Sequence, residues 1–140
     1  MTEPKTSELE PAWDALVRRT LTTPAAGRLK LSLIAASQAE VSIFLPFSPD
    51  NRTEGDIVHG GVIATLIDIA GVAAAVAASR RLPEAGATSS LCINYLCAAV
   101  ACDLTAHALL LRAGRQNVVR VTVSAPAKMI AEGHVTVVLH

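Results

Sequence analysis

The spacing of hydrophobic residues along the chain predicts which segments are helices and which are strands. Over residues 7–21 the hydrophobic residues recur every three or four positions, which predicts an amphipathic amino-terminal helix. They are Leu9, Ala12, Trp13, Leu16, Val17 and Leu21. Pro24 and Gly27 follow, and they predict the end of this helix.

Later segments carry the pattern of strands. Hydrophobic and polar residues alternate in 29–33 and 41–45, and residues 36–39 between them suit a hairpin turn. Four more strand-like runs follow at about 87–97, 103–112, 117–125 and 128–139. In the third of these runs, valines alternate with polar residues, which predicts one buried side and one side that faces solvent.

Residues 59–79 form the most apolar segment and predict one long helix without a polar stripe. Such a helix must be surrounded by protein or by lipid. Asp68 lies at its middle, where a carboxylate inside a bilayer costs about 2.5–3.5 kcal/mol, so we expect no membrane span. Short connections favour antiparallel strand pairing. The prediction is therefore an α+β fold, a single domain over 1–140 in which one curved antiparallel sheet wraps around the long helix.

Composition and charge narrow the class of protein. The 140 residues carry 12 Lys and Arg against 12 Asp and Glu, so the net charge is zero and nucleic acid is not an expected partner. Hydrophobic residues make up 51% of the chain, a surplus that predicts a subunit interface. The amino terminus has no apolar run after a basic cluster, so we expect no signal peptide and a cytoplasmic protein.

The cysteines and histidines do not have the spacing of a metal site. Cys92, Cys97 and Cys102 lie five residues apart, unlike the two-residue gaps of zinc sites, and we expect them to be reduced thiols that pack as small buried hydrophobes. The four histidines do not match a metal-binding pattern either. No serine-hydrolase elbow or nucleotide-binding glycine motif is present. We therefore expect neither a metal nor a bound redox cofactor.

A His-Gly-Gly triplet at residues 59–61 opens the predicted long helix and is the first candidate for chemistry. Glycine inside a helix costs about 1 kcal/mol relative to alanine. In the first turn, however, glycine lets a ligand approach backbone N–H groups that have no acceptor within the helix. Such donors suit an oxyanion. A close contact between the helix start and a strand explains the glycines equally well at this point.

Asp68 is the second candidate. A carboxylate in so apolar a helix is either hydrogen-bonded to a buried hydroxyl or amide, or acts as a nucleophile or general base. Gly60 and Asp68 are eight residues apart, which corresponds to about 12 Å along one helix. Because this is too far for both to act on one carbonyl, a joint site requires two subunits with antiparallel helices, and hence a dimer with two equivalent sites.

The triplet at 59–61, with Asp68 and Gly71 after it and residues 90–96 on the next strand, resembles the PaaI-like acyl-CoA thioesterases of the hotdog-fold superfamily. The resemblance covers about residues 40–140. It implies a curved antiparallel sheet around one long helix, in dimers that often pair into tetramers. It also implies hydrolysis of an acyl-CoA to the free acid and CoA, with the CoA thioester as substrate and no cofactor.

The resemblance further implies a role for individual residues. The Gly60 N–H polarises the thioester carbonyl, and Asp68 of the facing subunit acts as general base or nucleophile. Thr88 helps to position the attacking water, and His59 organises the loop and the helix start. Asn51 departs from the family pattern, because it precedes the histidine by eight residues instead of six, so it reaches the thioester only if the loop bulges.

The sequence gives less information on the residues that contact CoA than on the candidate catalytic residues. Basic side chains are expected to meet the phosphates of CoA. The candidate CoA-binding residues are Arg80, Arg81, Arg112, Arg115 and, at the helix start, Gly61. Two other functions remain open: a non-catalytic acyl-CoA-binding module, which has no need of Asp68, and an enoyl-CoA hydratase, which usually pairs its aspartate with a nearby histidine that 69–76 lack.

Overall fold

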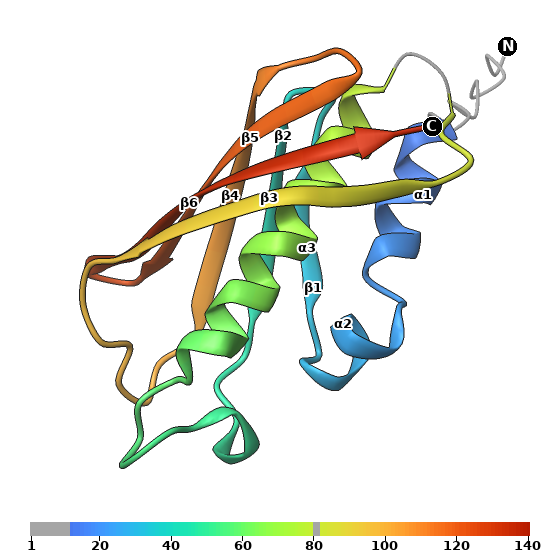
Figure 1. The fold of residues 1–140 in the computed structure, drawn as a ribbon. Helices are drawn as coiled ribbons and strands as arrows, with labels where there is room; N and C mark the ends of the chain where they lie inside the picture. Colours follow the sequence, from blue (N-terminus) through green and yellow to red (C-terminus); the bar gives the residue numbers. More distant parts are fainter. Residues whose placement is uncertain (1–11, 80–81) are drawn as a thin grey trace, which may run out of the picture.

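The computed structural model describes residues 12–79 and 82–140, and its longest helix, α3 (Gly60–Ala78), lies within a curved sheet (Figure 1). The sheet has six antiparallel strands in the order β1-β2-β4-β5-β6-β3. The strands are β1 (Ser32–Ala36), β2 (Glu40–Leu45), β3 (Gly86–Tyr95), β4 (Leu104–Arg112), β5 (Gln116–Ala125) and β6 (Lys128–Leu139). Every strand predicted from the sequence overlaps one of these, and the α+β prediction is confirmed.

Two short helices precede the sheet and correct one sequence prediction. α1 (Ala12–Thr20) lies within the predicted helix 7–21, whose first residues fall outside the described part of the chain. Pro24 and Gly27, expected only to end that helix, instead belong to a second helix, α2 (Pro24–Arg28). A proline in the first turn of a helix lacks only an N–H that has no partner there, so it begins a helix as readily as it ends one.

The first strand begins later than the hydrophobic pattern predicted. The pattern gave 29–33, but Leu29 caps α2 in a helical conformation and Lys30 has a φ of 55°. An extended strand does not continue through a residue in the left-handed region. β1 therefore begins at Ser32, where it pairs with β2.

The core lies between α3 and the inner face of the sheet. Val119, Val121 and Val123 of β5 have no exposed surface, which confirms the alternation predicted for this strand. The sheet also comes unusually close to α3 at Gly71, where an added Cβ would lie 2.7 Å from Val135 Cβ. Glycine at this position is therefore required by packing.

α3 is long and apolar enough to cross a membrane by length and composition. In the folded chain, 56% of this stretch is buried inside the protein, against the sheet and α1. The sheet thus provides the cover that a helix without a polar stripe requires.

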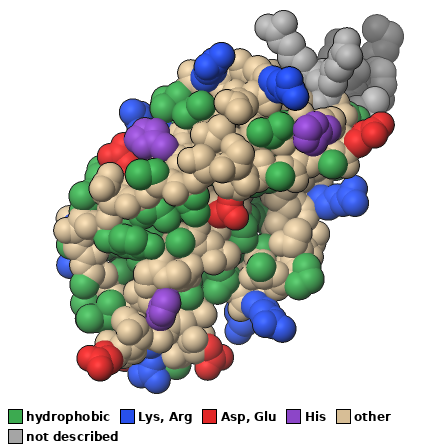
Figure 2. Space-filling model, in the orientation of Figure 1, with side chains coloured by type: hydrophobic (Ala, Val, Ile, Leu, Met, Phe, Trp, Pro, Cys, Tyr) green, Lys and Arg blue, Asp and Glu red, His purple; other side chains and the backbone are tan. Residues whose placement is uncertain are grey.

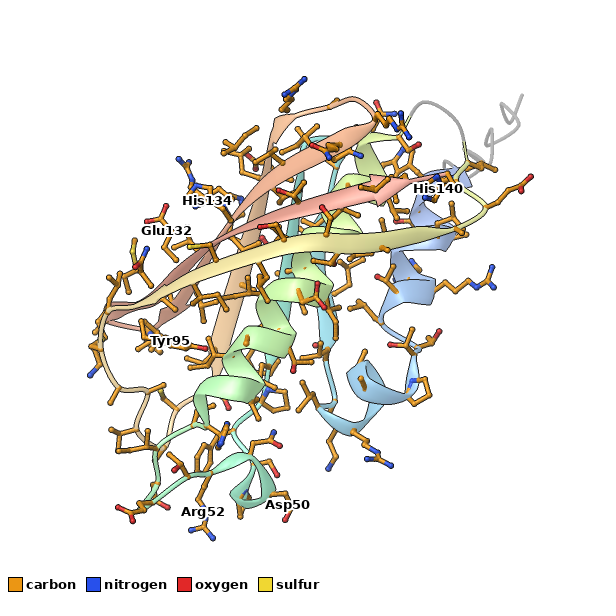
Figure 3. All side chains as sticks on the ribbon, in the orientation of Figure 1. Asp50, Arg52, Tyr95, Glu132, His134 and His140 are labelled. Atoms are coloured by element: carbon orange, nitrogen blue, oxygen red, sulfur yellow. The ribbon has the colours of Figure 1, made fainter. Side chains whose placement is uncertain are left out.

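The cysteines correct another sequence prediction. We expected small buried hydrophobes, but Cys92 and Cys97 are exposed and only Cys102 is partly buried; all three are free thiols. Cys92 lies opposite His134 in the pairing of β3 with β6, and His134 is itself exposed, so both belong to the outer face of the sheet. In Figure 3, His134 and Glu132 point away from α3. Within residues 12–79 and 82–140 no cluster of potential metal ligands is found.

Candidate active site

The His-Gly-Gly triplet forms the amino-terminal cap of α3. His59 is the N-cap residue, and its Nδ1 accepts a hydrogen bond of 2.8 Å from the Gly61 N–H. An added Cβ on Gly61 would lie 2.9 Å from this nitrogen, so only glycine fits there without displacing the imidazole. The second glycine of the triplet is therefore explained by the cap itself.

The carbonyl oxygen of Gly60 also accepts a hydrogen bond. The Tyr95 hydroxyl, at the end of β3, donates a hydrogen bond of 2.7 Å to the Gly60 carbonyl oxygen. Figure 3 shows Tyr95 beside the first turns of α3. The peptide that joins Gly60 to Gly61 is therefore held at both ends, by Tyr95 at its carbonyl and by His59 at its N–H.

The Gly60 N–H is different from its neighbours. In the described part of the chain it donates no hydrogen bond, whereas the N–H groups of Val62 and Ile63 donate to the His59 carbonyl. Gly60 is partly exposed. An unpaired N–H at the positive end of a helix is a donor available to a negatively charged ligand atom.

The loop before the helix brings Asn51 beside the cap. Arg52 pairs with Val58, and the Thr53 N–H donates to Ile57, so the chain from 52 to 58 closes as a small hairpin. As a result the Asn51 carbonyl accepts a hydrogen bond of 2.8 Å from the His59 N–H. The hairpin thus places the backbone of Asn51 next to His59, while a contact of the Asn51 side chain with a thioester stays a prediction.

Asp68 and Thr88 meet in the middle of α3. The Thr88 hydroxyl on β3 donates a hydrogen bond of 2.6 Å to Asp68 Oδ1. Both residues are partly exposed, so the carboxylate is reachable from outside the protein. The structure thus brings these two predicted residues together within one chain.

The predicted site residues fall into two groups. Asn51, His59 and Gly60 lie at the start of α3, whereas Asp68 and Thr88 lie about 12 Å further along its axis. Within one chain the unpaired N–H and the carboxylate cannot contact the same carbonyl.

A cavity of about 370 Å³ opens at the first group. Gly60 and Tyr95 line it, together with apolar side chains that include Ile57, Ile63 and Leu96. The unpaired donor therefore lies on a mostly apolar cavity, where hydrogen bonds to a charged atom are stronger than in water.

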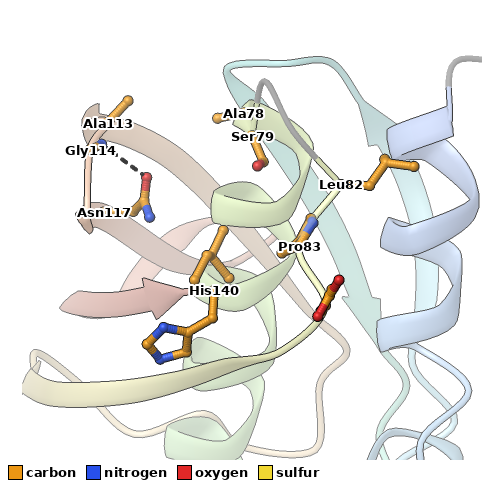
Figure 4. Close-up of a pocket in the computed structure, with 10 residues that line it drawn as sticks. Ala78, Ser79, Leu82, Pro83, Ala113, Gly114, Asn117 and His140 are labelled. Atoms are coloured by element: carbon orange, nitrogen blue, oxygen red, sulfur yellow. Dashed lines mark hydrogen bonds between the residues drawn. The ribbon is translucent and has the colours of Figure 1, made fainter.

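A second cavity, of about 670 Å³, lies at the opposite end of α3 (Figure 4). The turn between β4 and β5 forms one wall, and Asn117 holds this turn by accepting a hydrogen bond from the Gly114 N–H and donating one to the Val137 carbonyl. Arg112 and Arg115 lie on either side of Gly114 and are exposed. Arg80 and Arg81, the other predicted phosphate contacts, lie outside the described residues.

The chain matches a known family over its site-bearing region. Residues 55–125, about half of the chain, match the thioesterase superfamily. This chain belongs to the thioesterase superfamily. The match includes α3 with its cap, β3 and the two strands that follow.

Solved structures of the family support the fold. A thioesterase family protein from Silicibacter pomeroyi superposes with a TM-score of 0.84 at 19% identity, covering 91% of this chain and 97% of its own. Zebrafish thioesterase superfamily member 2 gives a TM-score of 0.77 at 26% identity, covering 90% and 94%. The fold is the hotdog fold that the sequence resemblance implied.

A third similar structure carries a ligand. It is a hypothetical thioesterase from Streptococcus pneumoniae, determined with coenzyme A, with a TM-score of 0.71 at 19% identity over 79% of this chain and 85% of that protein. A search among curated proteins gave no significant match.

Sequence reasoning gave no role to Tyr95. It is the one tyrosine in the chain and ends the strand that bears Thr88, but its partner Gly60 lies 35 residues earlier. No local pattern reports a contact over this separation, so only the folded structure shows the bond.

Proposed function

We propose that this protein hydrolyses acyl-CoA thioesters to the free acid and CoA, as a PaaI-like member of its superfamily. The observation that carries the proposal is the unpaired Gly60 N–H at the start of a helix that also bears the Asp68–Thr88 pair. Membership of the thioesterase superfamily supports thioester hydrolysis in general. A related structure determined with coenzyme A supports CoA as the thiol part of the substrate.

In this proposal the Gly60 N–H stabilises the oxyanion that forms on the thioester carbonyl. Water adds to the carbonyl carbon, and the negative charge that develops on its oxygen accepts a hydrogen bond from Gly60. Tyr95 and His59 fix the adjoining peptide, so the donor is already oriented before the substrate binds. A donor that needs no reorientation is most effective in the transition state.

Asp68 acts as the general base. It takes a proton from the attacking water, which the Thr88 hydroxyl oxygen helps to hold while its own proton is donated to Asp68. The tetrahedral intermediate then collapses, the carbon–sulfur bond breaks, and the leaving thiolate takes the proton to give CoA. Attack by Asp68 itself, through an acyl-aspartate, is the alternative route. Single-turnover hydrolysis in labelled water separates them, since only the covalent route puts label into the Asp68 carboxylate.

The site is completed by a second copy of the chain. β3 is an edge strand of ten residues that pairs only with β6 among the described strands, and Leu91, Tyr95 and Leu96 on or beside it are exposed. Figure 2 shows hydrophobic side chains gathered on the face where α3 and β3 lie, with charged side chains mostly towards its rim. Pairing of two β3 edges across a two-fold axis makes the α3 helices antiparallel and brings Gly60 of one copy towards Asp68 of the other.

The phosphates of CoA are assigned to Arg112 and Arg115. Both side chains are exposed beside the cavity at the carboxyl end of α3 and have no carboxylate partner in the described structure. Guanidinium groups bind phosphate oxygens in a fork geometry, which favours arginine for this task. The protein needs no metal or redox cofactor in this proposal and acts in the cytoplasm.

The test is release of free thiol from short, long and aromatic acyl-CoAs by the wild-type protein and by Asp68→Asn. We expect the variant to lose about 10³-fold in kcat, because removal of a general base together with its charge costs ~4 kcal/mol of transition-state stabilisation. Glu40→Gln, an exposed carboxylate on β2, four strands away from β3 in the sheet, is the matched control. Binding of acyl-CoA without turnover in the wild type would instead identify a binding module.

A further inference from the structure

A groove of about 450 Å³ lies between α1, α3 and the start of β3, outside the two groups of site residues. Val72 and Val76 of α3 form one wall, Leu16 of α1 forms another, and Gly86 of β3 and Leu139 of β6 complete it. Leu16, Val72 and Leu139 are only partly covered in the described structure. The groove therefore presents aliphatic surface that is open to a ligand.

The groove lies about one helical turn beyond the Asp68–Thr88 pair. Val72 follows Asp68 by four residues, so the two side chains lie on the same face of α3, one turn apart. Gly86 precedes Thr88 by two residues on β3, so both face the same side of that strand. A group held at Asp68 that extends towards the carboxyl end of α3 would therefore reach the groove at Val72.

The floor of the groove is kept open by a glycine. An added Cβ at Gly86 would lie 2.6 Å from Leu139 Cδ2, so any side chain here would displace the leucine. The described lining residues include no aromatic side chain. Of the polar ones, Arg19 and Glu84 are exposed, and the hydroxyls of Thr20 and Thr23 already donate to backbone carbonyls. The chemistry that fits is an extended aliphatic chain.

We propose that this groove binds a straight aliphatic acyl chain and that Val72 sets the chain length the enzyme accepts. This inference rests on the proposed thioesterase function and adds its substrate class. The pantetheine arm of CoA is the other part of the substrate that reaches Asp68, but it carries amide groups. Against the wall formed by Val72, Val76 and Leu139, no side chain would pair with those amides, whereas an aliphatic chain has no hydrogen bond to lose there.

The experiment measures kcat/KM for straight-chain acyl-CoAs from acetyl to lauroyl, and for benzoyl-CoA and phenylacetyl-CoA. For the wild type we expect a rise of about fourfold per added CH₂ until the groove is filled, the fold-change that corresponds to ~0.8 kcal/mol for each buried CH₂. The aromatic substrates are expected to fall below octanoyl-CoA.

Val72→Phe places a ring in the groove and is expected to lower kcat/KM for octanoyl-CoA at least tenfold more than for acetyl-CoA. Val138→Phe is the matched control: this residue lies on the opposite side of β6 from the buried Val137. The control is expected to keep the wild-type dependence on chain length. Thermal unfolding and molar mass of both variants show whether they are folded and assembled.

Two results would overturn the groove assignment while leaving the thioesterase in place. In the first, Val72→Phe lowers kcat/KM by the same factor for every chain length, and free CoA inhibits the variant more weakly than the wild type. This result would place pantetheine in the groove. In the second, the wild type hydrolyses acyl-CoAs but its kcat/KM does not rise with the length of the acyl chain. If no thioester is hydrolysed, the proposed function fails. The groove is then tested alone by the affinity for non-hydrolysable alkyl-CoA thioethers, which must still rise with chain length and fall with Val72→Phe.

Discussion

At the scale of single residues, the first turn of α3 leaves one backbone N–H, that of Gly60, without a hydrogen-bond acceptor in the described structure. His59 takes up the Gly61 N–H, and its carbonyl takes up those of Val62 and Ile63. The Gly60 N–H alone is left over among these four donors. The first N–H groups of a helix have no acceptor within it, and at Gly60 this donor is open to a ligand.

Gly60→Pro tests this donor with little disturbance of the fold. Proline is favoured at the first helical position, and the extended backbone of His59, with ψ of 134°, suits a residue that precedes proline. The variant removes the N–H, and we expect kcat to fall about 10²–10³-fold, as for loss of an oxyanion-hole donor. Gly60→Ala keeps the N–H, and its Cβ would lie at an ordinary contact distance of 3.6 Å from Tyr95, so it should lose far less activity. Equal losses in the two variants would contradict the assignment.

Tyr95→Phe tests the bond that holds the adjoining Gly60–Gly61 peptide. The substitution removes the 2.7 Å hydrogen bond to the Gly60 carbonyl but keeps the ring that packs against Gly60. One hydrogen bond contributes about 1 kcal/mol, so kcat should fall roughly fivefold while KM stays close to wild type. Ser89→Ala, which removes another hydroxyl of β3, is the control. A change in KM alone would show that Tyr95 acts on substrate binding instead.

The candidate site residues differ in how far the sequence alone could point to them. The glycines and Asp68 stood out because they break the rule of an apolar helix, and Thr88 followed from the family resemblance. The Tyr95 contact, the hairpin that brings Asn51 to His59, and the groove beyond Val72 each join segments that are apart in the chain or shaped by packing. Periodicity reports only local structure, so it could not show them.

At the scale of elements, the contact of α3 with the sheet depends on glycine at 71. A Cβ at this position would lie 2.7 Å from Val135 Cβ, closer than real contacts allow. Gly71→Ala should therefore destabilise the fold by about 1–3 kcal/mol despite the higher helix propensity of alanine. Urea denaturation measures the change. Ala70→Gly, on the same buried stretch of α3, is the control. It shows how much stability this helix loses from a substitution that creates no steric overlap.

A substitution on the exposed edge of β3 tests the proposed pairing of two chains. Leu91 lies on this edge strand with 39% of its surface exposed, and a lysine on an edge opposes pairing with another strand. We expect Leu91→Lys to lower the molar mass in solution to that of the 14.6 kDa chain and to abolish hydrolysis together with it. Leu111→Lys, which changes an exposed leucine near the end of β4, should do neither. An active monomeric Leu91→Lys protein would refute the shared site.

Elements were the most predictable level of this structure. Strand alternation and the apolar length of α3 are local features, and they placed all six strands and the long helix. The errors have local steric causes as well: a proline that begins α2, and a left-handed Lys30 that delays β1. The exposure of two cysteines was missed because Cys92 lies on the outer face of β3 and Cys97 follows the end of that strand, and hydrophobicity alone does not report either position.

At the scale of the whole molecule, the central claim is that two chains build each active site. One chain places Gly60 and Asp68 about 12 Å apart along α3, whereas the proposed mechanism requires both at one carbonyl. An antiparallel pair of α3 helices resolves this separation and gives two equivalent sites per dimer. The arrangement also accounts for the apolar surface along β3.

Mixed dimers of Gly60→Pro and Asp68→Asn chains test this claim most directly. Each variant alone is expected to keep at most about 1% of the wild-type kcat, because both of its sites lack one group. In a mixed dimer, one site lacks both groups and the other has both, so co-refolding equal amounts should restore about a quarter of the wild-type kcat, since half of the dimers are mixed and each holds one intact site. Mixing that restores no activity, while mass measurements show that mixed dimers have formed, would contradict the shared site.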